Sequence, residues 1–135
     1  MPRKPATDGI MQITREASTS HLVRAWEPGR IRIGEHWYSG NLIVTAETIV
    51  SDWTLATPGH VTVADLEPAL ALGPELIVVG AGAAATPPDV DLMAELAARG
   101  VGLEFMQIQA ACRTFNVLVH ERRRVAAALV PDLVR

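Results

Sequence analysis

An apolar run at Leu76–Val79 constrains the fold more than any other feature of this sequence. Gly73 and Pro74 precede the run, and Gly80 and Gly82 follow it. Four consecutive apolar residues, most of them β-branched and bounded by turn residues, are typical of a strand buried on both faces of a sheet. The run therefore predicts a central strand of an α/β domain.

The segments after this run alternate between helix and strand patterns. A helix is predicted from Pro87 to about Arg99, and Gly100 is a good residue for its end. Its expected inner face consists of Val90, Met93, Leu96 and Ala97. A strand over residues 101–106 and a helix over 109–120 follow. This alternation predicts a parallel βαβ crossover of right-handed sense.

The residues before the run predict a β-meander and then one short helix. Strands are expected at His21–Trp26, Ile31–Ile33, Leu42–Thr45 and Thr48–Val50. The helix, residues 63–72, begins near Thr62, and its Pro68 fits only if it lies in the first turn. Residues 1–20 carry no sustained period and are interpreted as a flexible arm before a single α/β domain, residues 21–135.

The tail permits two interpretations. Residues 125–130 either continue the preceding helix, because alanine favours helices, or form a further strand after an arginine-rich turn. Arg122, Arg123 and Arg124 at that turn are interpreted as a solvated edge, since a phosphate clamp needs several converging contacts.

Bulk composition restricts the function classes. The chain has 135 residues, 49% of them hydrophobic, and a net charge of −3, which gives no basic excess for binding nucleic acid. The single cysteine excludes an internal disulfide and redox CxxC chemistry, and it fits the bacterial cytoplasm. Neither a transmembrane run nor a secretory signal is recognised, and the histidines lack metal-ligand spacing, so no cofactor or metal is expected.

The carboxyl end of the predicted parallel sheet is the candidate ligand crevice. Gly80 and Gly82 follow one strand, Met106 ends the next, and a helix begins just after it. Ligands of α/β sheets bind at this edge, because parallel strands deliver their ends to the same side. Residues 80–85 match a dinucleotide-binding glycine pattern, but the prolines at 87 and 88 favour an ordinary tight turn. The candidate crevice comprises Gly80, Gly82, Met106, Cys112, Arg113 and Asn116.

Cys112 has two interpretations. A thiol near a helix start and beside Arg113 favours the thiolate, as in a nucleophile. No base or oxyanion site accompanies it, because His120 lies two turns away. Cys112 is therefore predicted to be a buried structural residue, with Arg113 reaching backbone carbonyls or Glu121.

The C-terminal sequence resembles a known family of small uncharacterised proteins. Ala110–Leu118, which reads ACRTFNVL after one alanine, is the most specific part, and Glu121–Leu129 continues it. Gly34, the strand after Gly40, Trp53 and the Gly80 turn also match. Together these residues resemble the Mth938-like domains, which include the mitochondrial respiratory complex I assembly factor 3. Family members commonly carry threonine at Ala81, tyrosine at Phe115 and glycine at Arg122.

The resemblance implies a fold and a function class. The implied fold has three layers, with a central mixed five-stranded sheet whose last strand is antiparallel, helices and an added small β-layer. It also implies that residues 125–130 form a strand. The implied function is a non-enzymatic assembly or scaffold protein that binds a protein partner, peripheral to a membrane complex or as a homodimer. The alternative is a small-molecule binder or enzyme that uses the candidate crevice.

Overall fold

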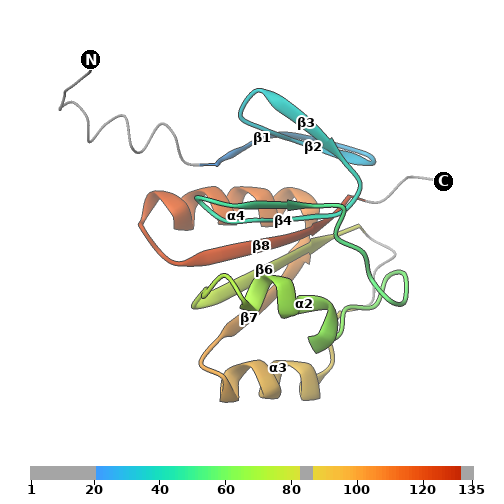
Figure 1. The fold of residues 1–135 in the computed structure, drawn as a ribbon, viewed down its shortest axis with the longest axis vertical. Coiled ribbons are helices and arrows are strands. Elements are labelled where there is room, and N and C mark those ends of the chain that lie inside the picture. Colours follow the sequence, from blue (N-terminus) through green and yellow to red (C-terminus); the bar gives the residue numbers. More distant parts are fainter. Residues whose placement is uncertain (1–20, 83–86, 132–135) are drawn as a thin grey trace.

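The computed structural model describes residues 21–82 and 87–131 (Figure 1). The arm predicted for residues 1–20 lies outside the described residues. The strands are β1 (Val23–Glu27), β2 (Arg30–Ile33), β3 (His36–Ser39), β4 (Leu42–Val44), β5 (Ile49–Ser51), β6 (Leu76–Ala81), β7 (Gly102–Gln107) and β8 (Val125–Val130). The helices are α2 (Val63–Leu70), α3 (Val90–Ala98) and α4 (Ile108–His120).

The main sheet has five strands in the order β5-β4-β8-β6-β7, and β1, β2 and β3 form a separate antiparallel sheet. This arrangement confirms the predicted mixed five-stranded sheet with an added small β-layer. The four segments expected to be neighbours, at residues 42–44, 76–79, 102–105 and 125–130, do share one sheet.

The direction of the last strand differs from the expected one. β8 runs parallel to β6, and β6 runs parallel to β7, whereas β4 is antiparallel to both β5 and β8. The antiparallel strand is therefore β4, and the expectation that the last strand is antiparallel is wrong. The cause is α4, which returns the chain to the end of the sheet where β7 began, so that β8 enters in the same direction.

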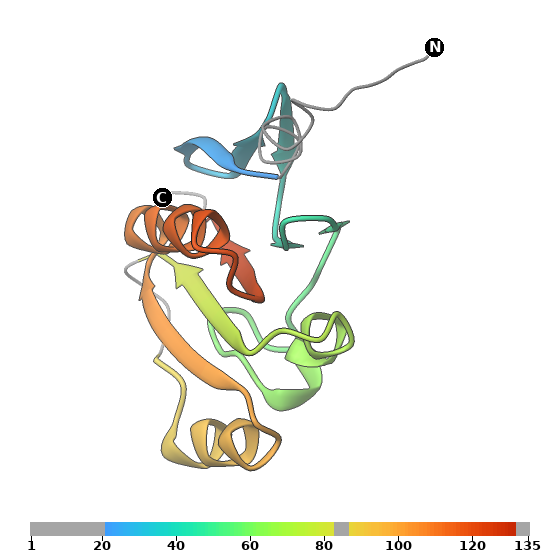
Figure 2. The same ribbon diagram turned by 90° about the vertical axis from the view of Figure 1, so that its left-hand side faces the viewer.

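Side chains of the central strands alternate between two cores, one on each face of the sheet. Along β8, Ala126 and Ala128 face the core under α2 and α3, whereas Ala127 and Leu129 face the core under α4 and the small sheet. All six residues of β8 are buried, which confirms the strand interpretation of the tail. In both views the small sheet lies beside α4, at the opposite end of the molecule from α3 (Figures 1 and 2). Three layers result, as expected.

The start of α2 is fixed by a reciprocal cap. The Thr62 side chain accepts from the Asp65 backbone N–H, and the Asp65 carboxylate accepts from the Thr62 backbone N–H at 2.9 Å. Pro68, however, lies in the second turn, and not in the first turn as predicted. Its missing N–H leaves the Ala64 carbonyl without a helical partner, and Ala64 is exposed, so water can satisfy that oxygen.

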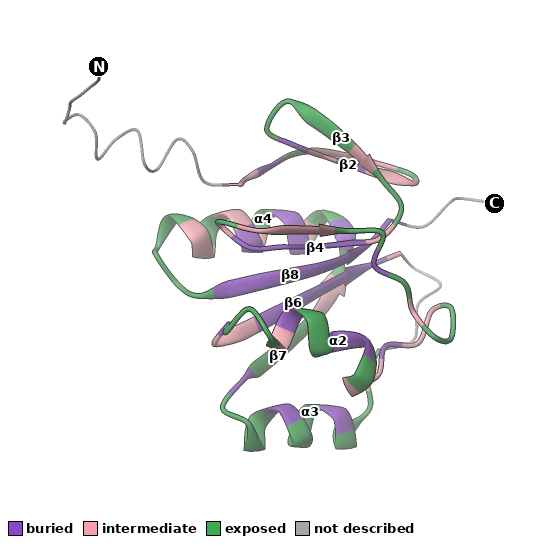
Figure 3. Ribbon diagram, in the orientation of Figure 1, coloured by how far each residue is buried: buried purple, intermediate pink, exposed green. Residues whose placement is uncertain are grey.

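The inner face of α3 also differs from the prediction. Leu92 and Leu96 are its buried residues, whereas Val90, Met93 and Ala97 are exposed (Figure 3). Only Leu96 of the four predicted inward residues is buried. Apolar residues occur on two sides of this helix, and only one side contacts β7 and α2.

Candidate functional site

Gly80, Met106 and the start of α4 meet at the carboxyl ends of β6 and β7. Gly80 pairs with Met106, and Ala81 pairs with Gln107, immediately before α4 begins at Ile108. The convergence predicted for Gly80, Met106 and the start of α4 is therefore confirmed. The remainder of the glycine turn, residues 83–86, lies outside the described residues.

Gly80 lies in close contact with side chains of the protein itself. A Cβ at this position would be 2.4 Å from the Ala111 Cβ and 3.0 Å from the Leu129 Cδ2. Non-bonded carbon atoms do not approach so closely, so the missing side chain is what allows α4 to lie on β6. The glycine is thus explained by helix–strand packing. Ligand binding by these residues stays a prediction.

Asn116 joins α4 to the small sheet. Its side-chain Oδ1 accepts a hydrogen bond from the Val23 N–H at 2.9 Å, and its Nδ2 donates one to the Val23 carbonyl at 2.8 Å. Both ends of the amide are therefore used by one backbone residue of β1. The amide acts here as a structural clamp between two layers.

Cys112 and Arg113 differ in their surroundings. Cys112 is only 7% exposed, and burial raises the pKa of its thiol to about 11, although the nearby Arg113 charge lowers it. Arg113 is exposed, and no ion pair or side-chain hydrogen bond within residues 21–82 and 87–131 joins it to Glu121. The burial predicted for Cys112 is confirmed, whereas the predicted contact with Glu121 is not formed.

We expect the native Cys112 thiol to react slowly with iodoacetamide. A thiol with a raised pKa stays protonated at pH 7 and 8, and only the thiolate attacks. At pH 8 the rate should be roughly a hundredfold below that of the same chain in denaturant, and it should keep rising toward pH 11. The thiol of Cys112 has a higher pKa in the folded chain than in the unfolded chain. The free energy of unfolding should therefore fall as the pH rises from about 9 to about 11. A reaction that saturates near pH 7 would indicate an activated nucleophile instead.

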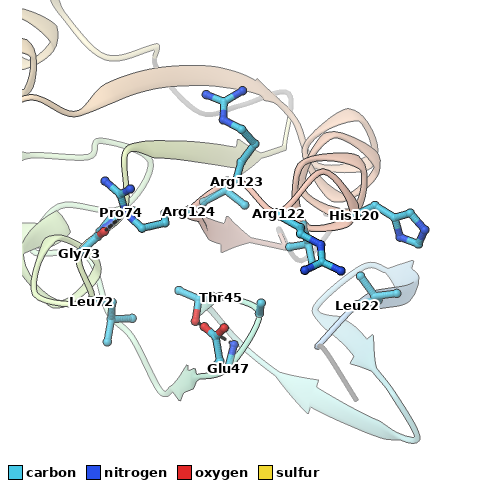
Figure 4. Close-up of a pocket in the computed structure, with 13 residues that line it drawn as sticks. Leu22, Thr45, Glu47, Leu72, Gly73, Pro74, His120, Arg122, Arg123 and Arg124 are labelled. Atoms are coloured by element: carbon cyan, nitrogen blue, oxygen red, sulfur yellow. Dashed lines mark hydrogen bonds between the residues drawn. The ribbon is translucent and has the colours of Figure 1, made fainter. Parts of the chain in front are cut away.

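A pocket with a volume of about 600 Å³ lies at the opposite end of the sheet (Figure 4). Three chain segments form its walls: residues 45–47 after β4, residues 72–74 between α2 and β6, and residues 119, 120 and 122–125 from the end of α4 to the start of β8. Leu22 completes the lining. The sequence does not predict this pocket, because its walls lie far apart along the chain and none of them carries a binding motif.

Neither a metal site nor a membrane-spanning helix is found in the described part of the chain. No group of three or more His, Cys, Asp or Glu side chains there could hold a metal ion. Within the same residues, no helix has the length and apolar character needed to cross a bilayer.

Comparison with known proteins finds relatives that match most of this chain. The chain is 32% identical over 124 residues to NADH dehydrogenase [ubiquinone] 1 alpha subcomplex assembly factor 3 of Danio rerio. The aligned segment covers 90% of this chain and 70% of that protein. The chain is also 35% identical over 130 residues to an uncharacterised protein of Rhodobacter capsulatus, covering 96% and 92% of the two chains.

A solved structure agrees with these relatives. The solution structure of a Bordetella pertussis protein, described as an Mth938-like domain, matches with a TM-score of 0.72 at 27% identity and covers 98% of this chain and 92% of that one. The family model described as a protein of unknown function, DUF498/DUF598, matches residues 23–130. The matched range holds the small sheet, the main sheet and all three helices described above. The chain therefore belongs to the DUF498/DUF598 family and has the Mth938-like fold.

Proposed function

We propose that this protein is a non-enzymatic assembly or scaffold protein that binds a partner through the exposed apolar face of α3. Val90 is 79% exposed and Met93 is 45% exposed, and Ala94 and Ala97 beside them are exposed as well. These four residues, the α3 stripe, stand at positions i, i+3, i+4 and i+7, so they form one continuous surface. Contiguous exposed apolar surface is typical of protein interaction sites. The α3 stripe is the observation on which the proposal rests.

Two further observations support a binding role over a catalytic one. Several relatives, including the Danio rerio protein, are named as an assembly factor of NADH dehydrogenase. In the predicted crevice, the Cys112 thiol has a raised pKa and the Asn116 amide is used by the Val23 backbone. Neither group is therefore prepared to attack or to orient a substrate.

The size of the α3 stripe favours a transient partner over a second copy of this chain. The stripe spans two helical turns, roughly 11 Å. A stable homodimer buries at least about 1,200 Å² in total, which this surface alone does not supply. By relation to the named relatives, the partner is a subunit or an assembly intermediate of a respiratory NADH dehydrogenase. The protein would then act from the cytoplasm at the periphery of that membrane complex.

Site-specific photo-crosslinking in cells tests this proposal. A photoreactive residue at position 93 should give one adduct containing a dehydrogenase subunit, whereas the same residue at Val117, which is 55% exposed on α4, should not. Ala94→Glu should lower the yield at position 93 by roughly tenfold, because a carboxylate without a partner is costly to bury in an apolar contact. Thermal unfolding of that variant should be unchanged, since Ala94 is exposed.

Two outcomes would contradict the proposal. An adduct with twice the mass of this chain, and no other, would assign the α3 stripe to a homodimer. Equal crosslinking at positions 93 and 117, unaffected by Ala94→Glu, would show that α3 has no specific partner.

A further inference from the structure

The walls of the pocket at the start of β8 are tied together by backbone hydrogen bonds. The Glu75 N–H donates to the Arg124 carbonyl at 2.7 Å, which joins the α2–β6 turn to the α4–β8 turn. The His21 N–H donates to the Ala46 carbonyl at 3.0 Å, which holds the first strand against the turn after β4. The pocket is therefore preformed, and its volume of about 600 Å³ suits a small organic ligand.

Arg122, in the pocket lining, adopts a backbone conformation that favours glycine. The N–H of Arg122 donates to the Val119 carbonyl and the N–H of Arg123 donates to the Leu118 carbonyl, both at 2.9 Å. This pattern ends α4 in a Schellman motif, in which Arg122 has the left-handed position with φ of +63°. An arginine at this position costs stability relative to glycine, so its side chain calls for an explanation in terms of function.

The neighbouring arginines have partners within the described part of the chain, whereas Arg122 has none there. Arg123 and Arg124 both pair with Glu75, and the Arg124 Nε also donates to the Gly73 carbonyl at 3.1 Å. Among the described residues, no ion pair or side-chain hydrogen bond involves Arg122. Figure 4 shows its guanidinium directed into the pocket, between Leu22 and Glu47.

The chemistry of the lining identifies the ligand class. A guanidinium without a partner presents two parallel N–H donors that match the two oxygens of a carboxylate. Leu22, Leu72 and Val119 contribute apolar surface elsewhere in the pocket lining. The geometry points to a binding site for an organic monocarboxylate: the carboxylate is held by Arg122, and an apolar chain lies against this surface.

A singly charged ligand fits this lining better than phosphate. Glu47 stands in the same lining as Arg122 and would repel a second negative charge, whereas the charges of Arg123 and Arg124 are already shared with Glu75. This site shares no residue with the α3 stripe, so the two proposals can fail independently.

Titration of the ¹⁵N-labelled full chain with sodium octanoate tests the inference. Saturable shifts are expected at the amides of residues 45–47, 72–73 and 122–125. Arg122→Gly should weaken octanoate binding at least about tenfold, since it removes a bidentate, charge-assisted hydrogen bond. The same variant should unfold at a higher temperature than the parent, because glycine suits the left-handed position. Lost binding in a more stable protein cannot be attributed to misfolding.

Control variants and probes decide the remaining outcomes. Arg32→Gln removes a half-buried arginine of β2 that lies outside the pocket lining, and it should leave octanoate binding unchanged. Glu47→Gln should tighten octanoate binding about two- to threefold, because it removes the repulsion between the Glu47 carboxylate and the carboxylate of the ligand. Equal binding of octylamine, equal or tighter binding of inorganic phosphate, unaltered octanoate affinity in Arg122→Gly, or shifts confined to the Gly80 edge would each overturn the inference.

Discussion

Replacing Gly80 by alanine is expected to destabilise the protein by about 3 kcal/mol, the upper part of the range for an overfilled core. The new Cβ would stand 2.4 Å from the Ala111 Cβ, and neither backbone can move freely. Gly80 is held in register with both Met106 and Leu129, and Ala111 belongs to the buried face of α4. Relief would require α4 to move away from the sheet and open its core. Urea unfolding followed by circular dichroism measures the loss.

A second substitution tests whether the loss comes from the contact with Ala111 or from any side chain added at this position of β6. In Gly80→Ala combined with Ala111→Gly, the added and removed methyl groups nearly balance, so the double variant should regain most of the stability lost by Gly80→Ala. Some cost should remain, because glycine weakens a helix interior by about 1 kcal/mol. The Leu129 Cδ2, at 3.0 Å, must also adjust. A double variant less stable than either single variant would show that the 2.4 Å contact is not the cause.

Replacing Asn116 by alanine is expected to cost about 2–4 kcal/mol, because two buried backbone groups lose their partners at once. The Val23 N–H and carbonyl both bind this amide, and Val23 is only 7% exposed. The effect should be greatest at β1, so hydrogen exchange at the Val23 N–H should accelerate more than at β6. Urea unfolding measures the loss of stability, and hydrogen-exchange mass spectrometry measures the faster exchange at β1.

Two variants sharpen the Asn116 experiment. Asn116→Asp keeps an acceptor for the Val23 N–H but turns a second acceptor toward the Val23 carbonyl, so it should not restore stability. Val117→Ala changes the neighbouring exposed residue of α4 and should alter stability by less than about 0.5 kcal/mol. Equal losses in Asn116→Ala and Val117→Ala would show that the amide does not clamp the two layers.

Local patterns predicted most of the elements, because their causes are local. The apolar run at β6, the cap at Thr62 and the turn at Gly100 each act through residues that are neighbours in the sequence. The strand interpretation of residues 125–130 required the family resemblance. Their alanine content favours a helix, and only burial between β4 and β6 makes them a strand.

Features set by packing between distant segments could not be predicted in the same way. Apolar residues occur on two sides of α3, so periodicity alone cannot tell which side β7 covers. At the carboxyl edge, the sheet rule brought Gly80 and Met106 together correctly, but only coordinates reveal that α4 fills the space beside Gly80. The pocket beside Arg122 is assembled from three separate chain segments. The left-handed backbone of that residue is indicated only by the glycine that family members commonly carry there, and not by the arginine itself.

The position of β8 determines when the sheet can form during synthesis. Among the described strands β8 is the last to be synthesised, yet it lies between β4 and β6 and provides the link between them. Until residues 125–130 emerge, the β4–β5 hairpin and the β6–β7 pair each expose an unpaired strand edge. Such edges readily pair with other chains, and chaperones commonly shield nascent proteins that carry them. The order of the strands thus predicts that the nascent chain needs protection from such pairing until β8 takes its place between β4 and β6.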